Sequence, residues 1–148
     1  MSPVISLIKP QLEKLFSSKQ KRLSALIVLI IELITITPLC GYLFQCGCDW
    51  PWLGLDEKCN YHQSHIKQQC PWCASMLMGI LSTALAIMMG VYASSISMEL
   101  FSNQHKVKEL VIRNLIGLSA FILTATIMAI VAASWQNYPL PMLRLYFR

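Results

Sequence analysis

Hydrophobic and polar positions alternate in long blocks along this chain. Three apolar runs, at residues 23–44, 74–98 and 114–135, are separated by polar segments. A helix needs about 20 residues to cross a hydrocarbon layer of roughly 30 Å, so each run is long enough to span a membrane. Backbone polar groups must be paired within lipid, and therefore each run must be helical. The pattern predicts an all-α integral membrane protein with three transmembrane helices.

Composition leads to the same class of protein. Of the 148 residues, 55% are hydrophobic and 13% are charged, whereas a soluble domain carries about 25% charged residues. The lipid bilayer is therefore the expected solvent. The net charge of +5 is not arranged as a basic stripe with interleaved aromatic residues, so we expect no nucleic-acid binding.

The distribution of lysine and arginine predicts an orientation. Positive residues gather before the first run and between the second and third, whereas the 45–73 loop is nearly balanced in charge. The positive-inside rule then places segments 1–22 and 99–113 in the cytoplasm. The 45–73 loop and the 136–148 tail face outward from an inner (plasma) membrane. The inner positive residues are Lys9, Lys14, Lys19, Lys21, Arg22, Lys106, Lys108 and Arg113.

The N-terminal segment 1–22 has apolar residues at helical spacing beside Lys9 and Lys14. This pattern is typical of an amphipathic helix that lies on the membrane surface. A frayed tail is the competing interpretation.

All six cysteines fall in or just before the outer loop. A loop of this length without regular structure is uncommon unless it is functional or clamped. Disulfides persist in an oxidising compartment, so we expect a disulfide-stapled loop, although the sequence does not choose among the possible pairings. If stapling is its only role, the loop is a docking surface of a non-catalytic subunit in a larger membrane complex. The cysteines are Cys40, Cys46, Cys48, Cys59, Cys70 and Cys73.

The motif Cys70-Pro71-Trp72-Cys73 lies where the second apolar run begins. The start of a helix favours the thiolate form of a cysteine, and proline suits the first helical turn. We predict a redox pair in which Cys70 is the exposed nucleophile and Cys73 resolves the mixed disulfide. Such a pair would pass electrons between a soluble extracytoplasmic thiol protein and the membrane. The candidate exchange or disulfide partners are Cys46, Cys48 and Cys59.

This layout resembles the quinone-linked, disulfide-generating membrane enzymes of the DsbB and vitamin K epoxide reductase types. They also carry Cys-x-x-Cys at the outer start of a transmembrane helix, with further cysteines in an outer loop. The resemblance covers Cys70 to Cys73 and, loosely, the loop cysteines. It implies quinone as the cofactor. Those enzymes build a bundle of four helices, whereas three apolar runs are present here.

A metal site is the alternative chemistry of the loop. Cys59-x-x-His62-x-x-His65 is followed by Cys70-x-x-Cys73, which supplies thiolates and imidazoles at short spacings. These ligands suit zinc or copper, for binding or for delivery to another protein. In the competing interpretation His62 and His65 are solvated loop residues.

Two residues within the first apolar run also require interpretation. Glu32 lies near its middle, where an acidic side chain costs insertion up to about 3 kcal/mol. It is either a proton relay for redox chemistry or a protonated group bonded to hydroxyls of a neighbouring helix. Cys40 follows Pro38 near the outer end of the run, and we interpret it as a small buried packing residue.

Overall fold

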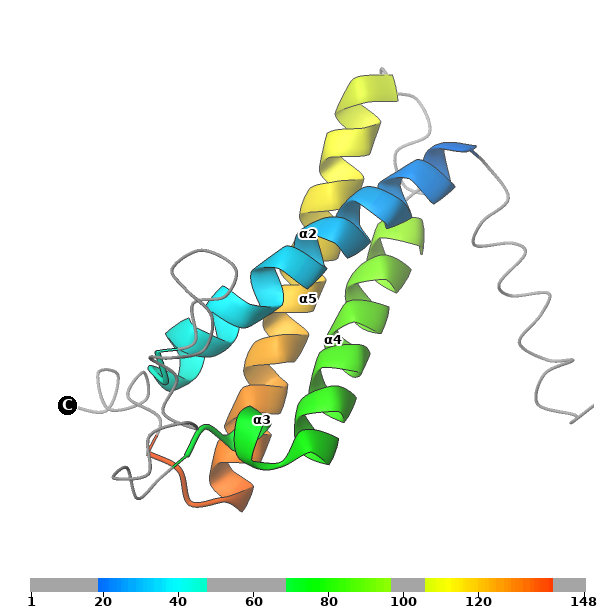
Figure 1. The fold of residues 1–148 in the computed structure, drawn as a ribbon. Helices are drawn as coiled ribbons and strands as arrows, with labels where there is room; N and C mark the ends of the chain where they lie inside the picture. Colours follow the sequence, from blue (N-terminus) through cyan, green and yellow to red (C-terminus); the bar gives the residue numbers. More distant parts are fainter. Residues whose placement is uncertain (1–18, 48–68, 97–105, 140–148) are drawn as a thin grey trace, which may run out of the picture.

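The computed structural model describes residues 19–47, 69–96 and 106–139. Within these ranges four helices follow one another: α2 (Lys19–Phe44), α3 (Pro71–Ala74), α4 (Met76–Ile96) and α5 (Lys106–Trp135). Helices α4 and α5 pack along each other most extensively, and α2 crosses both (Figure 1). The C-terminal ends of α2 and α5 and the short α3 all lie at the same end of the bundle (Figure 1).

The three long helices are apolar enough and long enough to cross a membrane. The qualifying segments are Lys21–Phe44, Met76–Ile96 and Val107–Trp135. Many large apolar side chains point away from the bundle, as helices surrounded by lipid require, among them Leu26, Ile30, Leu77, Met88, Leu115 and Leu123. The predicted all-helical architecture with three candidate membrane spans is confirmed. The orientation in the membrane stays a prediction.

The second and third long helices do not begin where the apolar runs predict. The second long helix is preceded by α3, a separate single turn that ends at Ser75, whose backbone is extended (φ −117°, ψ 95°). Gly79 lies against the backbone carbonyl of Trp72 so closely that a Cβ there would overlap it, so α3 folds back tightly onto α4. The third helix begins at Lys106 rather than near Asn114, because the charged residues before the apolar run continue the helix.

An ion pair within α5 shows why that extension is stable. Arg113 donates from Nε to Glu109 Oε1 at 3.1 Å, and both residues are buried. They are one helical turn apart, the spacing at which oppositely charged side chains stabilise a helix.

Small residues make close packing possible at the crossing of the three helices. A Cβ at Gly117 on α5 would lie 3.0 Å from the backbone oxygen of Gly90 on α4. Glu32 of α2 is completely buried at this crossing, with its carboxyl group against Gly90. Neither carboxyl oxygen has a hydrogen-bond partner among the described residues, so the hydroxyl partners expected for a structural role are not found there. Its role as a proton relay stays a prediction.

Several predictions fall on residues outside the described ranges. They are the interfacial helix within 1–18, most of the 45–73 loop, and the tail from residue 140 onward. The candidate site residues among them are Cys48, Cys59, His62 and His65.

Candidate functional site: a buried cysteine cluster

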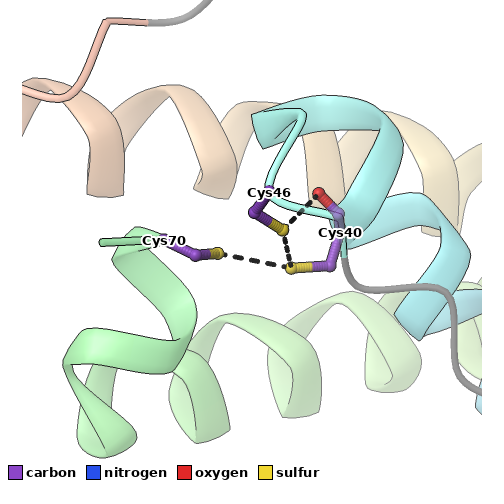
Figure 2. Close-up of side chains that lie close together, drawn as sticks. All are labelled: Cys40, Cys46 and Cys70. Carbon is purple, nitrogen blue, oxygen red and sulfur yellow. Dashed lines mark hydrogen bonds between the residues drawn. The ribbon is translucent and has the colours of Figure 1, made fainter. Parts of the chain in front are cut away.

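Three cysteines from two segments of the chain, the end of α2 and the residue before α3, meet at one end of the bundle (Figure 2). The sulfur of Cys40 lies 3.5 Å from that of Cys70 and 3.9 Å from that of Cys46. The Cys46 thiol also donates to the backbone oxygen of Cys40 at 3.7 Å. All three sulfur atoms lie within 4.8 Å of one another. We call Cys40, Cys46 and Cys70 the cysteine cluster.

Disulfide bonds are absent among the described cysteines. A disulfide requires about 2.05 Å between sulfur atoms, and the Cys40 sulfur lies 3.5 Å from that of Cys70 and 3.9 Å from that of Cys46. The expected staple is therefore not present between the described cysteines, which stand as neighbouring thiols.

The end of α2 folds Cys46 back toward Cys40. Helix α2 ends at Phe44, and Gln45 then adopts a left-handed conformation with φ 50°. This conformation commonly terminates helices and reverses the chain direction. Gly47 also has positive φ, at 75°, which glycine adopts without steric cost. The reversal brings Cys46 back beside the last turns of α2.

Cys70 occupies the position just before α3. Its backbone oxygen accepts hydrogen bonds from the amides of Cys73 at 3.0 Å and Ala74 at 2.8 Å. Pro71 stands at the first position of the turn, where its lack of an N–H group costs nothing. Gln136, the residue just after α5, donates through Nε2 to the Pro71 oxygen at 3.0 Å. The cysteine motif is thus held by its own turn and by the end of α5.

Three aromatic residues join the two cysteine-bearing segments. The Phe44 ring packs edge-to-face against Trp72, with centroids 5.3 Å apart, and against Tyr138, with centroids 5.8 Å apart. Tyr138 also donates its hydroxyl to the backbone oxygen of Phe44 at 2.9 Å. We call Phe44, Trp72 and Tyr138 the aromatic clamp. It holds the end of α2, which carries Cys40, against the turn that follows Cys70.

Burial differs among the four described cysteines. Cys70 is 0% exposed and Cys46 is 2% exposed, whereas Cys73 is only partly buried. Our expectation that Cys70 is the exposed member of the motif is wrong, because Trp72 and Pro71 are buried and hold the start of α3 inward. Hydrogen bonding from the Cys40 thiol, and next from the Cys46 thiol, lowers the pKa of Cys70. The thiolate is therefore favoured at the buried sulfur.

The structure brings together only some of the predicted site residues. Cys46 and Cys70 belong to the cluster, and Cys73 follows one turn later. Cys40, interpreted from sequence as a packing residue, contacts the sulfur atoms of both Cys46 and Cys70. The sequence feature that could have indicated a role for Cys40 is its position at the end of the first apolar run that is nearest to the other cysteines. The predicted metal ligands Cys59, His62 and His65 lie outside the described residues.

Adjacent buried thiols have two chemical capacities. They can exchange disulfide bonds with one another, and they can bind a thiophilic metal ion as thiolates. Comparisons with protein-family models, curated proteins and solved structures find no match to this chain, so its function has to be inferred from the cluster itself.

Proposed function

We propose that this protein is a membrane thiol–disulfide exchange protein in which the Cys70/Cys73 pair exchanges with the Cys40/Cys46 pair. The observation that carries the proposal is the 3.5 Å separation of the Cys40 and Cys70 sulfur atoms, with Cys46 at 3.9 Å from Cys40. Formation of a Cys40–Cys70 disulfide shortens that separation by about 1.5 Å, to the bond length of about 2.05 Å.

The first exchange involves a soluble dithiol protein. One partner thiolate attacks the Cys73 sulfur of a Cys70–Cys73 disulfide, and the bonding electron pair leaves with Cys70 as a thiolate. The second partner thiol then displaces Cys73, and the partner departs as a disulfide. Cys73 is the more exposed member of the pair, so the partner reaches its sulfur rather than that of the buried Cys70.

The second exchange occurs within the bundle. The Cys70 thiolate attacks Cys40 of a Cys40–Cys46 disulfide, and Cys46 leaves as a thiolate. Cys73 then attacks Cys70, which re-forms the Cys70–Cys73 disulfide and releases the Cys40 thiolate. The sum of both exchanges transfers two electrons and two protons from the partner dithiol to the Cys40/Cys46 pair, and the reverse direction uses the same steps.

We assign no step to a quinone. An open apolar cavity of about 360 Å³ is lined by Arg22, Ala25, Leu26, Leu29 and Val91. Eleven residues separate Leu29 from Cys40 along α2, which corresponds to about 16 Å of helix rise. A quinone ring held in this cavity is therefore too far away to contact the cluster.

Trapping the intermediate between the two pairs tests the proposal. In the double variant Cys46→Ser/Cys73→Ser, the competing thiols of both pairs are removed. After incubation in an oxidising glutathione buffer in mild detergent, we expect mass spectrometry with differential alkylation to find a Cys40–Cys70 disulfide. The matched variant Cys40→Ser/Cys73→Ser has the same number of cysteines but should not form this bond.

A second experiment tests whether the thiol of a soluble protein can reach Cys73. Wild-type protein oxidised in the same buffer is mixed with a reduced soluble Cys-x-x-Cys protein whose resolving cysteine is replaced by serine. We expect a mixed disulfide at Cys73. Absence of both the Cys40–Cys70 disulfide and the Cys73 mixed disulfide would exclude the exchange function.

A further inference from the structure

We infer that the reduced cysteine cluster is a binding site for Cu(I), with Cys40, Cys46 and Cys70 as its ligands. The inference deepens the proposed function, because it rests on the same sulfur atoms and adds a ligand for their reduced state. It depends on the convergence of three side chains, all of whose sulfur atoms lie within 4.8 Å of one another.

The sulfur spacing matches that of a shared metal ion. Metal–thiolate bonds of about 2.3 Å place tetrahedral sulfur ligands about 3.8 Å apart and trigonal ones about 4.0 Å apart. The Cys40 sulfur lies 3.5 Å from that of Cys70 and 3.9 Å from that of Cys46. Small side-chain rotations of Cys46 and Cys70 therefore suffice to enclose an ion.

The type of ligand selects the metal. The three ligand atoms are all sulfur, and their side chains are nearly completely buried. Soft thiolate ligands suit Cu(I), whereas Mg²⁺ and Ca²⁺ require oxygen ligands. A structural zinc site takes four ligands, and the described group supplies three. The partly buried Cys73 is the residue that would complete a zinc site, so its contribution distinguishes the two metals.

Metal binding and disulfide formation exclude each other at this site. A sulfur atom that takes part in a Cys40–Cys46 or Cys40–Cys70 disulfide is no longer a thiolate ligand. Bound Cu(I) would therefore hold the cluster reduced and block the internal exchange. Oxidised protein should not bind the ion, which links copper availability to the redox state of the site.

Anaerobic titration of the reduced full-length protein in detergent tests the site. Cu(I) is supplied as its complex with the chromophoric chelator bicinchoninate, and transfer to the protein is followed by absorbance. We expect one ion per chain. Replacing a metal ligand should weaken binding by more than the roughly tenfold to hundredfold loss seen for outer-shell residues. The variants for this purpose are Cys40→Ser, Cys46→Ser and Cys70→Ser.

Matched controls decide where the ion is bound. Cys48→Ser and Cys59→Ser also remove one cysteine each, and they should leave the affinity unchanged. Loss of binding in Cys59→Ser, or in the His62→Ala/His65→Ala variant, would place the metal in the outer loop and overturn the inference. Stoichiometric zinc binding that also requires Cys73 would overturn the choice of metal.

Spectroscopy of the wild-type protein avoids dependence on the folding of variants. X-ray absorption of the copper-loaded protein should show a single shell of three sulfur atoms near 2.3 Å, the usual metal–thiolate distance. Nitrogen ligands in that shell would refute the assignment. The exchange experiments are performed in the presence of a chelator without added metal, so a positive trapping result together with failed copper binding would reject the metal site alone.

Discussion

Replacing Gly90 by alanine should destabilise the bundle at the crossing of its three long helices. A Cβ added at Gly90 would overlap Oε1 of Glu32 and would lie 2.9 Å from both the Glu32 Cδ and the Phe121 Cβ. Carbon atoms in normal contact are about 3.5–4.0 Å apart. The carboxyl group of Glu32 can rotate away, but the Phe121 Cβ adjoins the backbone of α5. Helices α4 and α5 would therefore have to separate by several tenths of an ångström.

Two opposing contributions determine how much Gly90→Ala changes the free energy of unfolding. Overpacking of this kind costs about 1–3 kcal/mol, and the upper part of this range, about 2–3 kcal/mol, applies because the Phe121 Cβ cannot move without the backbone of α5. Alanine in place of glycine stabilises a helix by about 1 kcal/mol. We expect a net loss of about 1–2 kcal/mol in the free energy of unfolding. Because Glu32 contributes two of the three close contacts, Gly90→Ala should cost about 1 kcal/mol less in a Glu32→Ala background.

A double-mutant cycle compares the wild type, the two single variants and the Gly90→Ala/Glu32→Ala double variant. The free energy of unfolding of each protein is measured by SDS titration in mixed micelles, followed by circular dichroism. The control is Ala84→Leu, which adds a larger side chain at an exposed position of the same helix and should change the stability by less than about 0.5 kcal/mol. The reasoning would be refuted if Gly90→Ala were as stable as the wild type, or if its cost were the same with and without Glu32.

Three further predictions concern the cysteine cluster and the residues around it. Tyr138→Phe removes the hydroxyl that donates to the Phe44 oxygen and should lower the free energy of unfolding in SDS by about 1 kcal/mol. Gln136→Ala removes the hydrogen bond to the Pro71 oxygen, so hydrogen exchange of the α3 amides should become about fivefold faster. The lowered pKa of Cys70 should place the midpoint of its pH–alkylation profile below the ordinary value of about 8.5, so its labelling persists to lower pH than that of an ordinary cysteine.

Each of these predictions has a matched control. Tyr92→Phe alters an exposed tyrosine of α4 and Ser134→Ala alters an exposed residue of α5, and neither should reproduce the corresponding effect. Cys40→Ala removes the first thiol that hydrogen-bonds to Cys70, so the midpoint should rise. A midpoint that stays in place would mean that Cys40 does not set the acidity of Cys70. Residue-resolved labelling with methyl methanethiosulfonate, which is small enough to reach a buried thiol, provides the profile.

Periodicity and length were sufficient to predict the three long helices, because lipid leaves a long apolar segment no alternative to helical hydrogen bonding. The same reasoning does not locate helix ends in polar segments. The extension of α5 to Lys106 depends on the buried pair of Glu109 and Arg113, and burial of charge cannot be derived from hydropathy. The break at Ser75 depends on the contact between Gly79 and the Trp72 carbonyl, which lies between two helices.

The cysteine site was only partly predictable for a related reason. The Cys-x-x-Cys motif is local, so its position at the start of a helix followed from the sequence. The contact between Cys40 and Cys70 joins residues thirty positions apart, and it depends on the angle at which α2 crosses the other helices. That angle is set by close contacts such as those of Gly90 and Gly117. The pattern of small residues in the sequence indicates that helices pack closely, but it does not indicate which residues of two helices face each other.

In the proposed mechanism, the burial of Cys70 and the partial exposure of Cys73 determine the order of the exchange steps. Had Cys70 been exposed, a partner could attack it directly and leave Cys73 to resolve the complex, without involvement of Cys40. With Cys70 fully buried against Cys40 and Cys73 partly exposed, the exchange that we propose begins with attack by the partner at Cys73. The thiolate is then released at Cys70, whose sulfur lies 3.5 Å from that of Cys40. In the proposed mechanism, the attack by the partner therefore also produces the nucleophile for the internal exchange.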